Sequence, residues 1–189
     1  MIGSKGRARP RGDESVSLTV AFLRGIGPAR KAPGDALRRC LGEAGYETVV
    51  PVLASGNVIF GPSRARPRPD AIEAILAAHF GYAIPVVLRS AADIAAMIAA
   101  DPFAGIDLQR QTRFVSMLAA DAPDLSFEPP PDAGFAVIER RKRDLFVTRD
   151  NEKGSTVDMM AALDRVYRKK VTTRNWNTIE RIAGLLDRT

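Results

Sequence analysis

The chain has 189 residues, 46% of them hydrophobic, so it can bury a substantial core in one domain or in two small domains packed together. Lys and Arg number 28 against 22 Asp and Glu, and the net charge of +6 favours anionic partners in general. One cysteine and one histidine exclude a disulfide framework and a Cys/His zinc cluster within a single chain. We therefore expect no metal and no cofactor, and a cytoplasmic location fits.

The N-terminal residues 1–15 are basic and rich in Gly and Arg. The apolar run that follows is only about eight residues long and leads into Arg24, so it is too short for a signal peptide or a membrane span. We expect residues 1–15 to form a disordered basic extension.

Residues 16–90 predict a ferredoxin-like subdomain. Val16, Leu18, Val20 and Phe22 alternate with small or polar residues, which is the period of a strand with its even positions toward a core. Further patterns predict a helix at 36–44 and then a hairpin of strands 48–54 and 57–60 that turns at Ser55-Gly56. A second helix at 70–80 and a strand at 85–88 follow. The order β-α-β-β-α-β is typical of a ferredoxin-like sheet. Pro51 and Pro85 place the second and fourth strands at its edges, with the first and third central.

Residues 91–189 predict a second small α+β unit packed on the first. Ser90 and Asp93 form a capping box for one helix, and Ser155 and Asp158 form another. Strand-like runs lie at 113–118, 135–138 and 145–148. No internal sequence repeat is visible.

The stretch 171–179 surrounds the only tryptophan with side chains rich in hydrogen-bonding groups. Apolar residues recur there at helical spacing, which predicts a helix beginning within the stretch. A start at Thr172 or Thr173 buries Trp176, whereas a start at Asn177 leaves Trp176 before the helix, beside Arg174. We favour burial.

Three segments together resemble the bacterial family of uncharacterised proteins called domain of unknown function 1697. They are AFLRGI at 21–26, ASGNVIF at 54–60 and TTRNWNT at 172–178. The resemblance extends from Val16 to Leu186 and implies an α+β fold with a ferredoxin-like N-terminal part, but it implies no activity. The chain departs from the family pattern after Ile26, where its loop looks shorter and lacks the usual Asn.

The residue types near these segments favour binding of a small anionic ligand that carries phosphate or carboxylate. Arginine offers a planar fork of donors, asparagine adds neutral donors, and a helix N-terminus adds backbone N–H groups. The candidate ligand-binding residues are Arg24, Asn57, Arg174, Asn175 and Lys170. In the structural alternative, these side chains cap a helix and tie loops to the sheet.

Two other functions stay open. The net charge and the run Arg140 to Arg143 suggest a nucleic-acid-binding module, but Phe22 and Phe60 fall on faces that we expect to be buried, and base stacking requires exposed aromatics. An enzyme is the third possibility. Ser55 is a conceivable nucleophile, although no base accompanies it, and Cys40 lies on an apolar helix face. No catalytic set is recognisable, so catalytic residues are unknown.

Overall fold

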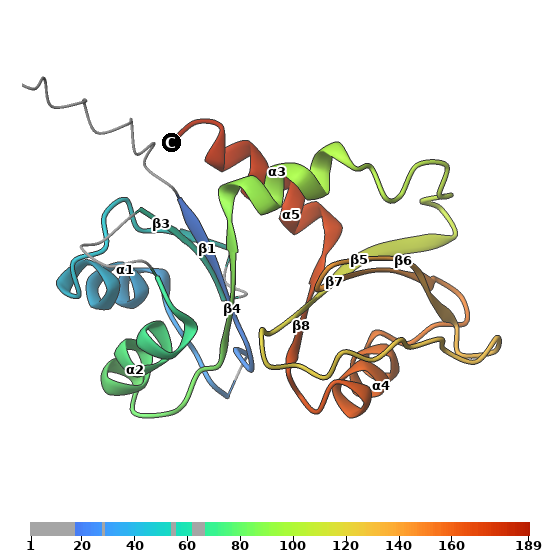
Figure 1. The fold of residues 1–189 in the computed structure, drawn as a ribbon, viewed down its shortest axis with the longest axis horizontal. Helices are drawn as coiled ribbons and strands as arrows, with labels where there is room; N and C mark the ends of the chain where they lie inside the picture. The colour runs from blue at the N-terminus through green and yellow to red at the C-terminus, as the bar shows by residue number, and fades with distance from the viewer. Residues whose placement is uncertain (1–17, 28, 54–55, 62–66) are drawn as a thin grey trace, which may run out of the picture.

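The computed structural model describes residues 18–27, 29–53, 56–61 and 67–189, and these form a mixed α+β fold of two four-stranded antiparallel sheets and five helices (Figure 1). The α+β class is as predicted. The first sheet has the order β2-β3-β1-β4. Its strands are β1 (Thr19–Leu23), β2 (Val50–Val52), β3 (Asn57–Phe60) and β4 (Val86–Ser90), and its helices are α1 (Gly34–Glu43), α2 (Pro69–Phe80) and α3 (Ala91–Ala99).

This first unit, β1 to α3, has the ferredoxin-like order predicted from the sequence. β2, which contains Pro51, and β4, which follows Pro85, are the edge strands, while β1 and β3 are central. Proline has no N–H to donate to a neighbouring strand, so it is tolerated in an edge strand, which is paired on one side only, or at a strand start. The two prolines therefore locate the edge strands correctly. Gly81 ends α2 in the left-handed conformation, and Ser90 and Asp93 form the expected capping box of α3.

The second unit, β5 to α5, repeats the topology of the first without the helix between the first two strands. Its sheet has the order β6-β7-β5-β8. The elements are β5 (Gln111–Leu118), β6 (Phe135–Arg141), β7 (Asp144–Asp150), α4 (Thr156–Val166), β8 (Val171–Asn175) and α5 (Trp176–Leu186). Loop residues replace α1, and α5 follows β8 directly, as α3 follows β4. Hence the chain contains a structural repeat that its sequence does not display.

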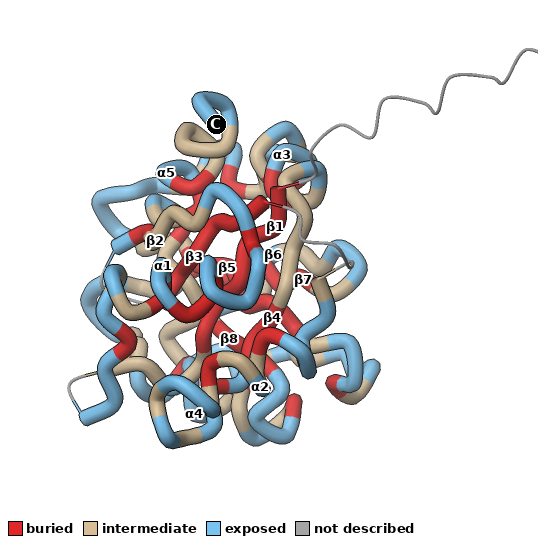
Figure 2. Tube along the Cα trace, turned by 90° about the vertical axis from the view of Figure 1, so that its left-hand side faces the viewer, coloured by how far each residue is buried: buried red, intermediate tan, exposed pale blue. Residues whose placement is uncertain are grey.

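Three apolar clusters hold the layers together. One cluster lies between the first sheet and α1 with α2, and another lies between the second sheet and α4. The third is shared, because one face of each sheet packs with α3 and α5, which also contact one another (Figure 1). The central strands are consequently buried on both faces (Figure 2). In β1 this includes Ala21 and Leu23, which the period-two pattern left outside the core.

The helix predicted to begin at Thr172, Thr173 or Asn177 begins instead at Trp176, and residues 171–175 form strand β8. This strand was missed. Its β-branched residues favour extended backbone, and pairing with β5 fixes that choice, but the pairing partner lies some 60 residues away and leaves no local signal. Asn175 is the N-cap, and its Oδ1 accepts from the Asn177 N–H at 2.9 Å.

The boundary predicted at 90/91 falls at the junction of β4 and α3, before the last helix of the first unit, and the division of the chain into two subdomains stays a prediction. The predicted extension 1–15 and the Ser55 turn residue lie outside the described residues. Among the helices of the described ranges, none is long and apolar enough to cross a bilayer.

Burial of Trp176, favoured from the sequence, is confirmed, because only 4% of the residue is exposed. The ring centroids of Phe103 and Phe146 lie 5.0 and 5.9 Å from that of Trp176, in edge-on geometry. We expect Trp176→Ala to lower the free energy of unfolding by about 3–5 kcal/mol, since it leaves a cavity in the shared core. Urea unfolding checks the loss, and blue-shifted emission of the wild type that iodide does not quench checks the burial. Red-shifted, readily quenched emission would contradict it.

Candidate functional site between the two units

Arg174, near the end of β8, reaches out of the second unit and binds the first. Its Nε donates to Asn57 Oδ1 at 2.6 Å, and its Nη2 donates to the carbonyl oxygens of Leu23 at 2.7 Å and Gly56 at 3.3 Å. Its Nη1 stays within β8 and donates to Thr172 Oγ1 and to the Thr173 carbonyl. All five guanidinium N–H groups are thus used, and Arg174 ties the end of β1 and the start of β3 to β8.

Arg89, near the end of β4, makes the same contacts in the opposite direction. We call two residues counterparts when they occupy the same place in the topology and strand register of the two units. Arg89 and Arg174 are counterparts, because they pair with Val20 and Val115 of the central strands. Arg89 Nη2 donates to the carbonyl oxygens of Leu118 at 3.1 Å and Arg143 at 3.2 Å, which are the counterparts of the Leu23 and Gly56 carbonyls. The two units therefore exchange arginines.

The two arginines differ in the charge of the partner that Nε reaches. Arg89 Nε donates to Asp144 Oδ1 at 3.0 Å, and Nη2 reaches the same atom at 2.7 Å. The first residue of β3, Asn57, is the counterpart of the first residue of β7, Asp144. Arg89 donates to a carboxylate, whereas every acceptor that Arg174 reaches among the described residues is neutral. Burial accordingly lowers the pKa of Arg174 to about 10.

Burial also raises the pKa of Asp144, although the neighbouring Arg89 acts in the opposite direction. Both side chains of this pair are only 12% exposed. A buried pair of this kind contributes little net stability when intact, but it is costly to break on one side.

A small cavity of about 230 Å³ lies beside Arg174. Arg24, Arg174 and Asp164 are its charged lining residues. Arg24 Nη2 donates to Asp164 Oδ2 at 2.6 Å and Nε donates to the Val171 carbonyl at 3.1 Å. Two cations and one carboxylate leave this cavity with a formal excess of one positive charge.

A larger cavity of about 660 Å³ lies where the two units meet. The first unit contributes β4 and the first turn of α2, and the second unit contributes the residues after β5 and the turn between α4 and β8. Three carboxylates and six cations line it: Asp70, Glu73, Asp121, Arg24, Arg89, Arg143, Arg168, Lys169 and Lys170. Val86, Val87, Leu88 and Val171 add an apolar wall, so the cavity suits an amphipathic molecule with a negative charge.

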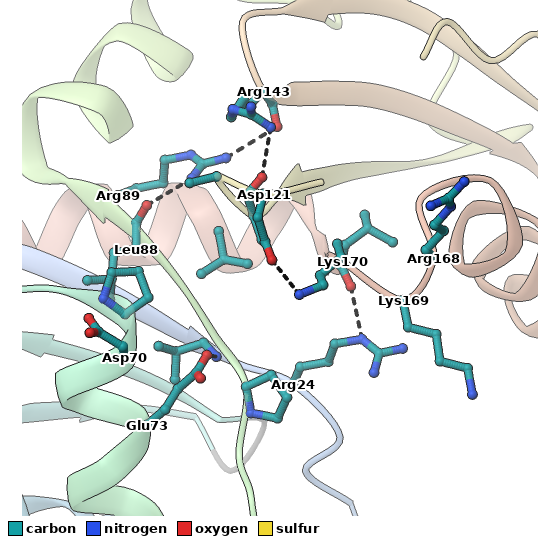
Figure 3. A pocket seen from close by; sticks show the side chains of 17 residues that line it. Arg24, Asp70, Glu73, Leu88, Arg89, Asp121, Arg143, Arg168, Lys169 and Lys170 are labelled. Atoms are coloured by element: carbon teal, nitrogen blue, oxygen red, sulfur yellow. Dashed lines mark hydrogen bonds and ion pairs between the residues drawn. The ribbon is translucent and has the colours of Figure 1, made fainter. Parts of the chain in front are cut away.

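The cations of the larger cavity differ in how strongly carboxylates of the protein hold them. Arg89 is held by Asp144, and Lys170 forms an exposed ion pair with Asp121 that Figure 3 shows across the cavity. This bond to Lys170 lowers the pKa of Asp121. The side chains of Arg168 and Lys169 extend at the rim beside Lys170, and neither side chain has a partner in the part of the chain that the structure describes. Both adopt left-handed backbone, with φ of 50° and 60°.

The structure divides the five predicted ligand-binding residues between separate environments. Arg24 lines both cavities, and Lys170 lines the larger one. Arg174 lines the smaller cavity and is bonded to Asn57, as the structural alternative expected. Asn175 caps α5. Arg89 and Arg168 were not predicted as site residues, and Arg143 was considered only within the run that suggested nucleic acid, because only the approach of the two units places the three at one cavity.

The residues that suggested nucleic acid are largely used within the protein. Arg140 binds Asp124 and Arg141 binds Glu139. Phe22 and Phe60 are fully buried, as expected, so these strands offer no stacking surface.

Of the two residues considered for catalysis, Ser55 lies outside the described residues, and Cys40 is unfavourably placed. Burial raises the pKa of Cys40, which suits a core residue and not a nucleophile. Across the described ranges, no group of three His, Cys, Asp or Glu could hold a metal. No catalytic constellation emerges from the described residues.

The fold is of the α+β class and consists of two four-stranded units that exchange arginines. The family model for a protein of unknown function, DUF1697, matches residues 17–134, and the chain belongs to this family. The match covers the first unit and ends before β6, so it is shorter than the resemblance seen in the sequence.

Among solved structures, the chain is similar to the conserved bacterial protein SP0830 from Streptococcus pneumoniae, with a TM-score of 0.69 and 19% identity. The likeness covers 92% of this chain and 99% of the other, and at this identity it shows the fold alone. No curated protein matches.

Gly56 is required where Arg174 docks. It has φ of 74°, and an added Cβ would lie 3.0 Å from Ile26 Cγ1 and 3.2 Å from Leu23 Cβ. We expect Gly56→Ala to lower the free energy of unfolding by about 1–3 kcal/mol. The matched control is Gly184→Ala in α5, where an added Cβ meets nothing within 4 Å and should stabilise by about 0.5–1 kcal/mol. Urea unfolding of both variants checks the signs, and equal effects would contradict the assigned role of Gly56.

Proposed function

We propose that the protein binds a small molecule carrying a phosphate or carboxylate group in the larger cavity between the two units. The observation that supports this most strongly is the gathering of six cations against three carboxylates, from segments far apart in the chain. The volume of about 660 Å³ falls within the range of small-molecule sites in general.

Lys170 is the main contact for the anionic group. Its present partner, Asp121, keeps 65% of its side chain exposed and Lys170 keeps 48%, so their ion pair contributes little stability. A ligand phosphate or carboxylate can replace Asp121 as the acceptor at small cost. Arg168 and Lys169 then add positive charge at the rim, and the apolar wall of β4 contacts the body of the ligand.

The turn that carries Arg168 and Lys169 supports a binding role. Left-handed backbone disfavours residues other than glycine, and glycine is the common choice after a helix such as α4. Cations at both positions therefore cost stability that glycine would restore. A residue that lowers stability at an exposed position is expected where its side chain serves binding.

The test is calorimetric titration of the full chain with glucose 6-phosphate, adenosine monophosphate, succinate and inorganic phosphate. We expect at least one organic probe to bind, and Lys170→Ala to weaken its binding about tenfold by removing one charge-assisted bond. Arg181→Ala is the control, because Arg181 is an exposed cation of α5 outside the cavity. If no organic probe binds at millimolar concentration, or if both variants weaken binding equally, the proposal is wrong.

A second variant separates binding from stability. We expect Arg168→Gly to raise the free energy of unfolding by about 0.5–1 kcal/mol, because the left-handed strain is relieved, and to weaken binding of the same probe. Urea unfolding and the same titration measure the two effects. Unchanged binding in Arg168→Gly would remove this residue from the site.

A further inference from the structure

The exchange of arginines leaves one partly buried, desolvated guanidinium without a counter-charge among the described residues. Arg174 donates all five N–H groups to a side-chain amide, a hydroxyl and three carbonyl oxygens, all of them neutral. In the described part of the chain it forms no ion pair. Hydrogen bonds to neutral groups satisfy its donors, but they do not supply the negative charge that a desolvated cation requires.

The other unit shows how the same position is neutralised. Asp144 begins β7 opposite Met117, and it gives Arg89 a carboxylate. Asn57 begins β3 opposite Phe22, and it gives Arg174 an amide oxygen. The geometry of the two junctions is alike in the carbonyl contacts, the register and the helix that follows, so the missing element at Arg174 is one negative charge.

The smaller cavity lies where that charge is missing. It is lined by Arg174 and Arg24 and has about 230 Å³, well above the roughly 30 Å³ that one water occupies in the liquid. Arg24 uses Nε and Nη2 for Val171 and Asp164, and its Nη1 makes no bond to the residues that the structure describes. The Thr172 hydroxyl, which accepts from Arg174 Nη1, also lines the cavity.

We infer that the smaller cavity is a second anion site, which takes a small inorganic oxyanion such as phosphate or sulfate as the counter-charge of Arg174. The oxyanion lies beside the Arg174 guanidinium, whose N–H groups are all donated elsewhere, so Arg174 contributes its positive charge. The hydrogen bond to the oxyanion comes from Arg24 Nη1, and a guanidinium N–H is a strong donor to such a group. Asp164 opposes it, but Arg24 already neutralises Asp164, so the remaining positive charge favours one anion. This site is structural and separate from the ligand proposed for the larger cavity.

The test places a carboxylate where the other unit has one. Thermal unfolding of the wild type is followed while inorganic phosphate replaces gluconate at constant ionic strength. We expect the wild-type Tm to rise by about 3–6 °C at ten times the dissociation constant. In Asn57→Asp the built-in carboxylate supplies the charge, so this rise should fall to the small nonspecific effect of phosphate. The variant loses the Asn57 Nδ2 bond to the Val52 carbonyl, so the readout is the phosphate dependence and not the Tm itself.

Asn175→Asp is the matched control. It makes the same chemical change one residue after Arg174, at an N-cap position where Asp and Asn serve equally. We expect it to retain the wild-type phosphate response. The inference is overturned if Asn57→Asp responds to phosphate as the wild type does, or if the wild type does not respond.

Diffraction keeps the inference testable if Asn57→Asp does not fold. Crystals of the wild type soaked in selenate should show an anomalous peak beside Arg174 and Arg24. A peak only in the larger cavity, or no peak in either, would overturn the second site. Failure of this test leaves the organic-ligand titration unaffected, because Asn57 and Arg174 do not line the larger cavity.

Discussion

The reciprocal exchange of Arg89 and Arg174 is the interaction on which the arrangement of the two units depends. Each arginine stands one residue before the cap of a helix, so the contacts that it makes with the other sheet also fix where α3 and α5 begin. The carbonyl oxygens that accept these bonds lie at the end of a central strand and before the adjacent strand. Buried carbonyls need donors, and the arginine of the other unit donates to each of these. The Gly56 and Arg143 carbonyls also accept from the N–H groups of Leu23 and Leu118 in their own units.

The cavities follow from this exchange. Arg89 lines the larger cavity and Arg174 the smaller one, and each cavity is bounded by the strand that carries its arginine and by the residues after the other unit's central strand. Arg24 stands between the two spaces and lines both. The same exchange brings several cations together with few carboxylates, so the protein's positive charge is concentrated where the units meet. The proposed binding of anions there follows from how the two units meet.

The sequence predicted the first unit well and the second only in part. Pro51, Pro85 and the Ser90 capping box are local signals, and each places its element correctly. β8 was missed because its extended backbone depends on pairing with β5, and the repeat was missed because counterparts such as Asn57 and Asp144 share position but not identity. Motif chemistry grouped Arg24, Asn57 and Arg174; Arg174 is bonded to Asn57 and shares the smaller cavity with Arg24, but Asn57 lines neither cavity, and ligand binding by this group stays a prediction. Their contacts could not be inferred, since these join residues more than 100 positions apart.

Two arginines of equal geometry differ in charge compensation, and their substitution by methionine separates the two contributions to stability. Unfolding of Arg89→Met and Arg174→Met is measured in urea without added oxyanion. Arg89→Met strands the buried Asp144 carboxylate, so a loss of about 3–5 kcal/mol is predicted. Arg174→Met strands only neutral acceptors and removes an uncompensated charge, so its loss should be about 1–2 kcal/mol. A loss in Arg174→Met that equals or exceeds the loss in Arg89→Met would contradict the account.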